Sequence, residues 1–206
     1  MAEISSSRSQ SAINDRARAS FPSGLRKLSE IDLSPKQQRL VVIADDLTGA
    51  TDTGLQFCKV GLRTAVYFDT PLSPGHCDVA AITTESRSCS ADEARRRLTE
   101  AGERVRSWNA KHIYKKIDST MRGNIGAEVE ALSIALDRSL AVLTPAFPAS
   151  GRTVRDGRLR VNGLSLAEGE FADDPLSPQR HSRVAKILAE QSNWRIVEIG
   201  MEQVRS

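Results

Sequence analysis

The sequence predicts an α/β fold, built as a doubly wound, mainly parallel sheet with helices on both faces. Short apolar strands alternate with helical segments as far as about residue 145, the pattern of right-handed βαβ crossovers. The first strand, residues 40–44 (LVVIA), is wholly apolar, as expected of a parallel strand covered on both faces. After about residue 145 turn residues dominate, and Asn162-Gly163 predicts a β-hairpin within this insertion.

Each later element has its own signal. Gly61 ends a helix expected over residues 50–61, and Ser90 with Glu93 forms a capping box before a helix expected over residues 91–108. Further helices are expected over residues 123–136 and 180–191. Short apolar or alternating runs predict five further strands, over residues 63–69, 78–86, 112–118, 139–145 and 194–200.

Composition excludes several classes of protein. Of 206 residues 39% are hydrophobic, and 29 basic against 26 acidic residues leave a net charge of +3. This balance argues against nucleic-acid or membrane partners, and no apolar run approaches a transmembrane span. The basic run Arg95–Arg97 lies among acidic residues of one helix, which favours a solvated face. Residues 1–38, rich in Ser and Arg, predict a disordered extension before a domain over residues 39–206.

The three cysteines, Cys58, Cys77 and Cys89, are odd in number and form no CxxC pair. They argue against a disulfide framework and a zinc site, and they favour a reducing, cytoplasmic location. Cys58, beside Phe57 on a helix, is expected in the core. The histidines are scattered without ligand spacing, so no metal site is expected.

Polar segments follow four of the predicted strands. They are Asp45-Asp46, residues 83–88 (TTESRS), 115–124 (KKIDSTMRGN) and 144–152 (TPAFPASGR). Ligands of doubly wound sheets bind at the carboxyl ends of the strands, near the topological switch point. We therefore expect these segments to converge on one cleft.

Asp45 and Asp46 point to opposite faces of an extended segment, so one is expected to line the site while the other caps the next helix. A carboxylate here can accept a proton from a substrate hydroxyl or bind a metal. Leu47 breaks the D-x-D pattern of aspartyl-phosphate enzymes. Neither a Walker A loop nor a G-x-G-x-x-G after the first strand is present, so the common nucleotide-binding signatures are missing.

The segment 115–124 has the makings of an anion site. Two hydroxyls, a guanidinium and free backbone N–H groups, contributed by Ser119, Thr120, Arg122 and Gly123, precede a helix. The anion can be a carboxylate or a phosphate. Capping explains one hydroxyl, but it requires neither the lysines nor Asp118 nor Arg122.

Two other segments offer weaker candidates. Arg87 follows Glu85 in "ESRS", where Ser88 or Ser90 can simply cap the helix. Gly151 and Arg152 can close over a ligand, although a rigid irregular loop explains the prolines before them equally well.

Together, "IADDLTGATDTGLQFCKVGLRTAVYFD", "ESRS", "YKKIDSTMRGNIGAEVEAL" and "TPAFPASGRTVRDGRLRVNGLSLAEGEFADDPLSP" resemble the N-terminal domain of the four-carbon acid sugar kinase family, formerly DUF1537. This family includes D-threonate, L-threonate, D-erythronate and 3-oxo-tetronate kinases. The likeness extends from about Leu40 to the C-terminus.

The resemblance implies a two-domain kinase whose N-terminal domain binds the sugar acid and whose second domain binds ATP with Mg²⁺. That second domain is expected to be missing here and to be supplied in cis or by a neighbouring gene. This chain alone is therefore expected neither to bind ATP and Mg²⁺ nor to phosphorylate its substrate. The implied catalytic residues are Asp45 and Asp46. The implied substrate-binding residues are Thr48, Gly49, Arg87, Lys116, Asp118, Ser119, Arg122, Gly123, Gly151 and Arg152.

An alternative from another class stays open. The Ser/Arg-rich extension and the missing half suit an interaction protein, such as a secreted type III effector-like or regulatory protein that kept the fold without catalysis. A homodimer is also possible.

Overall fold

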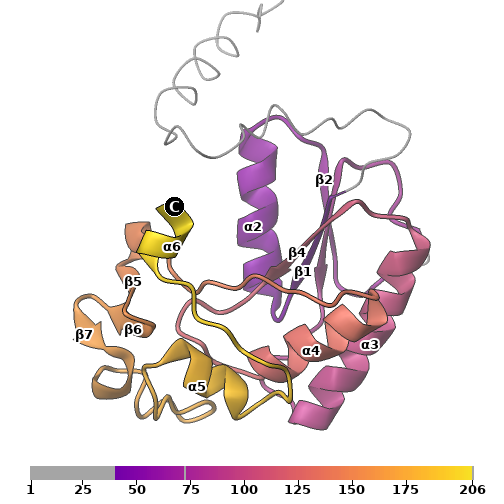
Figure 1. Cartoon of the computed structure of the whole chain (residues 1–206). Helices are drawn as coiled ribbons and strands as arrows, with labels where there is room; N and C mark the ends of the chain where they lie inside the picture. Colours follow the sequence, from indigo (N-terminus) through magenta and orange to yellow (C-terminus); the bar gives the residue numbers. More distant parts are fainter. Residues whose placement is uncertain (1–39, 72, 206) are drawn as a thin grey trace, which may run out of the picture.

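The computed structural model describes residues 40–71 and 73–205 (Figure 1). The predicted disordered extension over residues 1–38 lies outside the described residues. Within the described part, no helix is both long and apolar enough to cross a membrane.

A parallel sheet forms the centre of the molecule. Its strands are β1 (Leu40–Ala44), β2 (Thr64–Tyr67), β3 (Val79–Thr83) and β4 (His112–Lys116), in the order β2-β3-β1-β4. Ala44 at the end of β1 is paired with Thr83 of β3 and with Lys116 of β4. The carboxyl ends of these three strands are therefore level, and the segments that follow them start at the same edge.

Helices cover both faces of the sheet, which confirms the predicted fold class (Figure 1). On one face, Phe57 of α2 (Leu47–Lys59) packs with Leu40, Val42, Val79 and Ala81. The other face is covered by α3 (Ala91–Ser107) and α4 (Ile125–Ala135). The core on that face contains Val41, Ile43, Ile82, Leu98, Val105, Ala131, Leu132 and Leu136.

The insertion after residue 145 contains a small antiparallel sheet, made of β5 (Arg152–Arg155), β6 (Arg158–Val161) and β7 (Leu164–Ser165). The predicted Asn162-Gly163 hairpin joins β6 to β7, with φ of 51° and 85°. Asp156-Gly157 makes a second hairpin between β5 and β6, with φ of 51° and 72°. This second turn was not predicted, although Asp-Gly is the same hairpin signal.

Short helices flank this sheet. They are η2 (Pro148–Ser150), η3 (Leu166–Glu168), α5 (Val184–Ala189) and α6 (Met201–Arg205). Leu159, Leu166 and Ile187 of this region pack with Met121, in the segment after β4, and with Ile125, the first residue of α4. The insertion is thereby attached to the main sheet beside the segment that follows β4.

Three local predictions are wrong. Residues 139–145 are largely apolar and residues 194–200 mix apolar with charged residues, but neither segment forms a strand. Val142 is 89% exposed and Val197 is 66% exposed, because an apolar pattern does not supply the hydrogen-bonded neighbour that a strand needs. Cys58 is exposed rather than in the core: adjacent residues of a helix point in directions about 100° apart, and it is Phe57 that packs on the sheet.

Candidate functional site

Asp45 and Asp46 follow β1 and have different surroundings. Asp46 is the N-cap of α2 and accepts a hydrogen bond of 2.7 Å from the backbone N–H of Gly49. The Asp45 side chain is only 1% exposed, whereas that of Asp46 is 23% exposed. Asp46 therefore caps α2, while Asp45 is buried at the edge of the sheet.

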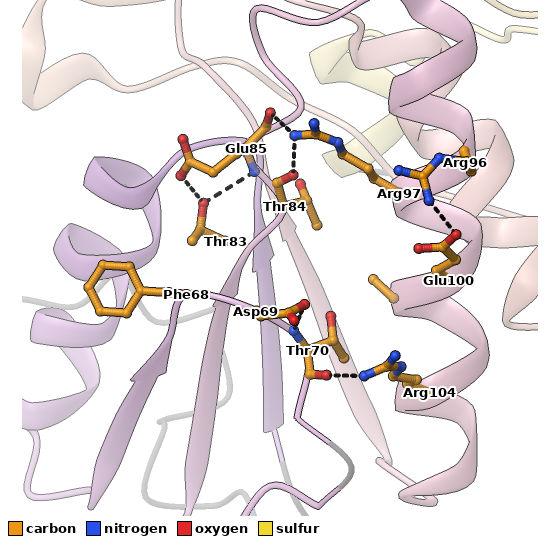
Figure 2. A pocket seen from close by; sticks show the side chains of 11 residues that line it. Phe68, Asp69, Thr70, Thr83, Thr84, Glu85, Arg96, Arg97, Glu100 and Arg104 are labelled. Carbon is orange, nitrogen blue, oxygen red and sulfur yellow. Dashed lines mark hydrogen bonds and ion pairs between the residues drawn. The ribbon is translucent and has the colours of Figure 1, made fainter.

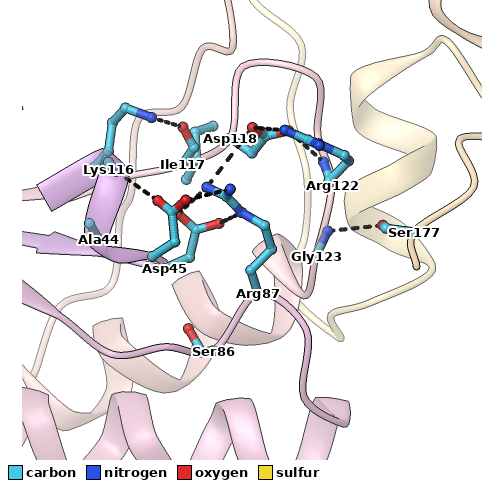
Figure 3. A network of polar contacts seen from close by, with 12 residues as sticks. Ala44, Asp45, Ser86, Arg87, Lys116, Ile117, Asp118, Arg122, Gly123 and Ser177 are labelled. Atoms are coloured by element: carbon cyan, nitrogen blue, oxygen red, sulfur yellow. Dashed lines mark hydrogen bonds and ion pairs between the residues drawn. The ribbon is translucent and has the colours of Figure 1, made fainter. Parts of the chain in front are cut away.

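Arg87, from the turn after β3, binds both aspartates (Figure 3). Its Nε and Nη2 donate to the two carboxylate oxygens of Asp45 at 2.7 and 3.0 Å, and its Nη1 donates to Asp46 at 2.6 Å. Burial alone would lower the pKa of Arg87. The hydrogen bonds to Asp45 and the charges of Asp45, Asp118 and Asp46 outweigh burial and raise that pKa.

Asp118 and Arg122 form a second pair in the segment between β4 and α4 (Figure 3). Arg122 donates from Nε at 2.9 Å and from Nη2 at 3.0 Å to the two oxygens of Asp118, which also accepts from the Thr120 hydroxyl. Burial would raise the pKa of Asp118, but these hydrogen bonds and the charges of Arg122 and Arg87 hold it well below its ordinary value. Asp118 Oδ1 lies 3.9 Å from Arg87 Nη2, so the two pairs form one network.

Gly123 brings the two turns into contact. Its φ of +88° lies in the left-handed region, and a Cβ at this position would lie 3.0 Å from Cγ and 3.1 Å from the backbone oxygen of Arg87. Its backbone N–H donates to the Ser177 hydroxyl at 3.0 Å, so the insertion also holds this turn. Only glycine combines this conformation with so close an approach.

The adjacent lysines at the end of β4 serve opposite faces of the sheet. Lys115 Nζ lies 2.7 Å from Glu128 Oε2 on the α4 side. Lys116 lies on the α2 side, since a Cβ on Gly49 would be 3.3 Å from Lys116 Cγ. Its Nζ donates to the Ile117 carbonyl at 2.6 Å, at the same strand end as Ala44.

The other predicted site residues lie farther out or elsewhere. Thr48 is exposed in the first turn of α2, and Ser119 is half-buried beside Asp118. Gly151 ends η2, and Arg152 begins β5 and donates from Nη1 to the Ser150 carbonyl. Between these two residues and the network of Figure 3, the described part of the chain shows no hydrogen bond or ion pair.

Several residues at the site were not predicted from the residue pattern. Phe171 lies under the guanidinium of Arg122, 5.4 Å from carbon to ring centroid, and Asp174 lies 3.7 Å from Arg122 Nη1. They and Ser177 come from an irregular segment some 50 positions later in the chain. Local pattern carries no signal for such long-range contacts.

A separate hollow of about 350 Å³ lies between the ends of β2 and β3 and α3 (Figure 2). Its arginines already have partners: Arg96 binds Glu93 and Glu100, and Arg97 binds Glu93 and two backbone carbonyls. The charges of the basic run are thus matched on their own helix. The network of Figure 3 lies outside this hollow.

The described residues show no ready-made metal site. Among them no group of three or more His, Cys, Asp or Glu side chains is placed to hold a metal ion. Asp45 and Asp118, the carboxylates nearest the strand ends, already have arginine partners. The arrangement suits a small ligand that offers both anionic and hydroxyl groups.

Fold and network together define an α/β domain for small polar ligands, with charged groups gathered where parallel strands end. The family model described as "Sugar-binding N-terminal domain" matches residues 40–206. The chain belongs to this family, the N-terminal sugar-binding domain of the four-carbon acid sugar kinases.

Two relatives illustrate the relationship. The chain is 46% identical over 172 residues to a D-threonate kinase of Salmonella typhimurium, covering 81% of this chain and 40% of the relative. It is 41% identical over 162 residues to a D-erythronate kinase of Heliobacterium modesticaldum, covering 76% of this chain and 37% of the relative. The chain thus spans about two fifths of the length of these kinases.

Solved structures agree with the fold. A DUF1537 protein of Bordetella bronchiseptica, a domain-swapped dimer with bound citrate, matches with a TM-score of 0.68 at 36% identity, over 73% of this chain and 39% of that one. A DUF1537 protein of Haemophilus influenzae matches with a TM-score of 0.69 at 30% identity, over 74% and 39% of the two chains.

Proposed function

We propose that this chain is the substrate-binding half of an ATP-dependent kinase that phosphorylates a hydroxyl of a four-carbon sugar acid of the threonate or erythronate type. The observation that carries the proposal is the charged network of Figure 3, in which three parallel strand ends contribute Asp45, Arg87 and the Asp118–Arg122 pair. A four-carbon aldonate offers a carboxylate and several hydroxyls, which such a network can bind.

The cationic residues neutralise the substrate carboxylate in this proposal. Arg122 is the main candidate, because 31% of its side chain is exposed at the edge of the network. Arg87 also approaches Asp118, and Lys116 lies on the far side of Ile117 and Asp118 (Figure 3). Arg152 completes the cationic set, as the family resemblance implies. The Bordetella relative was solved with bound citrate, which is itself a carboxylate ligand.

Other residues bind the hydroxyls. Ser119 supplies a half-buried hydroxyl beside Asp118, and Thr48 adds an exposed hydroxyl at the start of α2. The N–H groups of Gly49, Gly123 and Gly151 already donate within the chain, so these glycines shape the site through their backbone. Hydrogen bonds to several hydroxyls fix the sugar acid in one orientation. Such positioning is a main source of catalysis in phosphoryl transfer.

An aspartate orients and deprotonates the attacking hydroxyl. Asp46 is the better placed of the two, because the Asp45 side chain is only 1% exposed and both its oxygens face Arg87. Asp45 then keeps Arg87 in place. Phosphoryl transfer depends chiefly on alignment and charge neutralisation, so the base supplies a modest part of the catalysis.

The phosphoryl donor belongs to a part of the kinase beyond this chain. ATP with Mg²⁺ supplies the transferred phosphoryl group, and the second domain of the kinase, in cis or as a separate chain, holds them. We propose residues 39–206 as the substrate domain, inactive alone, and a cytoplasmic location. The domain-swapped dimer of the Bordetella relative makes self-association a further possibility.

Calorimetry tests the proposal. D-threonate, L-threonate and D-erythronate are titrated separately into the chain, and at least one is expected to bind. Arg122→Ala should weaken that binding at least tenfold, whereas Arg138→Ala, an exposed arginine after α4, should leave it within twofold. With ATP and Mg²⁺ added, the chain alone should give no turnover. Absence of binding to all three acids, or equal affinity in the Arg122 variant, would refute the assignment.

A further inference from the structure

A buried ion pair lies next to the network, on the α4 side of the sheet. Glu128 of α4 is 0% exposed, and its Oε2 lies 2.7 Å from Nζ of Lys115, whose side chain is 10% exposed. Taking two charges out of water is costly, and two apolar side chains can often fill such a space as well. The pair therefore calls for a role beyond packing.

The second oxygen of Glu128 shows what the pair holds. Glu128 Oε1 accepts a hydrogen bond of 2.7 Å from the hydroxyl of Ser86, which is itself fully buried. The Ser86 hydroxyl lies 2.8 Å from the hydroxyl of Thr84. Ser86 gives its only hydroxyl proton to Glu128, and Thr84 gives its own to the Ala44 carbonyl at 2.9 Å. The carboxylate thus fixes the Ser86 hydroxyl in the segment that leads into Arg87.

The backbone of that segment needs such support. Glu85 has a φ of +47°, a left-handed conformation that is unfavourable for a residue other than glycine. This turn lets the N–H groups of Ser86 and Arg87 donate to the Asp45 carbonyl, at 2.9 and 3.3 Å. On the outer side, Arg97 holds the Thr84 and Glu85 carbonyls at 3.3 and 2.6 Å (Figure 2). Glu128 holds the inner side.

We infer that Glu128 is a positioning residue: through Ser86 it holds the turn that aims Arg87 at Asp45, and Lys115, 2.7 Å from Oε2, holds the Glu128 carboxylate in place. A carboxylate is a stronger acceptor for the Ser86 hydroxyl than a neutral amide. A loss of ligand affinity when this support is removed rests on the proposed function. A weaker Arg87–Asp45 contact is expected whatever the chain binds.

Two variants remove this support with little change of shape. Ser86→Ala deletes the bridging hydroxyl, and the double variant Glu128→Gln with Lys115→Met removes both buried charges together. Glu130→Gln is the matched control, because it removes the same charge two residues later on α4, where Glu130 faces Arg95 and the N–H of Asn193.

NMR of the ¹⁵N-labelled chain follows the Nε–H of Arg87, which donates to Asp45, without any ligand. Its hydrogen exchange should become at least tenfold faster in Ser86→Ala and in the double variant, and stay within twofold in the control. Calorimetry with D-threonate should show about tenfold weaker binding in the same two variants.

Unchanged Arg87 exchange in Ser86→Ala overturns the inference, even if the double variant fails to fold. The inference is also overturned if the Arg87 exchange becomes faster in Ser86→Ala but becomes faster by the same factor in the control, Glu130→Gln. If the unsubstituted chain binds no sugar acid, the proposed function falls, and the exchange measurement still decides the role of Glu128.

Discussion

Arg87 donates two parallel hydrogen bonds to the Asp45 carboxylate, from Nε to Oδ2 at 2.7 Å and from Nη2 to Oδ1 at 3.0 Å, across the ends of two neighbouring strands. The planar guanidinium matches the carboxylate in a way that a lysine ammonium does not. Because the Asp45 side chain is only 1% exposed, water cannot easily take the place of Arg87 as its hydrogen-bond donor. The contact therefore matters to the stability of the strand ends as well as to ligand binding.

Arg87→Ala is expected to lower the free energy of unfolding by about 3–5 kcal/mol, because it leaves a buried carboxylate without its partner. The free energy of unfolding of Arg87→Lys should lie between that of the unsubstituted chain and that of Arg87→Ala, since lysine restores a charge but not the paired geometry. Urea denaturation followed by circular dichroism measures both. A loss below about 1 kcal/mol for the alanine variant would mean that Asp45 finds water or another partner.

Asp46 has a separable role as the cap of α2. Asp46→Ala should cost about 1–2 kcal/mol of stability, because the backbone N–H of Gly49 loses its acceptor. Asp46→Asn keeps an oxygen at that place and should recover most of the loss, while it still removes the charge facing Arg87. Thermal denaturation compares the two variants, and equal losses would contradict the capping role.

The sequence predicts which polar segments meet at the sheet edge better than it predicts how their residues pair. Parallel strands end at one edge of a sheet, so polar residues after β1, β3 and β4 could be expected to meet there. Which charges would pair was not evident, because Arg87 and Asp45 are 42 residues apart. Glu128 gave no signal at all, since a glutamate within a helix is ordinarily exposed.

The main sheet followed from its apolar strands, whereas two later strands did not form as predicted. Residues 139–145 have a similar apolar character to β1, yet Leu140 is 77% exposed and Val142 is 89% exposed. A strand exists only through hydrogen bonds to a neighbour, and composition cannot supply that neighbour. The Asp156-Gly157 turn, by contrast, has a hairpin signal in its own two residues, an Asp-Gly pair with positive φ at both positions.

Asp118 should make stability depend on acid pH. Its pKa is held below the ordinary value, so its charged form stabilises the folded chain above about pH 4, where the unfolded carboxylate is ionised too. As the pH falls below that value the unfolded chain takes up the proton first, and this stabilisation is lost progressively.

Asp118→Asn removes that titration. At pH 7 the variant should be less stable than the unsubstituted chain by about 1–3 kcal/mol, and the difference should shrink steadily between pH 5 and pH 2. Urea denaturation at several pH values gives the difference directly, and because both chains share the other carboxylates, their titration cancels. A difference that stays constant down to pH 2 would contradict the lowered pKa.

Gly123 offers the sharpest test of the close contact between the two turns. Gly123 and Gly61 have nearly the same left-handed backbone, with φ of +88° and +89°. A Cβ on Gly61 would meet nothing within 4 Å, whereas one on Gly123 would lie 3.0 Å from Arg87 Cγ. Alanine at the two positions therefore carries the same conformational strain but a different steric cost.

Gly61→Ala should lower the free energy of unfolding by about 1 kcal/mol, from backbone strain alone. Gly123→Ala should cost at least about 1 kcal/mol more, because the added methyl group must displace Arg87. Denaturation of both variants gives the difference, and the NMR signal of the Arg87 Nε–H should shift only in Gly123→Ala. Equal costs, with Arg87 undisturbed in both variants, would mean that the two turns can separate freely, and the network of Figure 3 would then not be held by this contact.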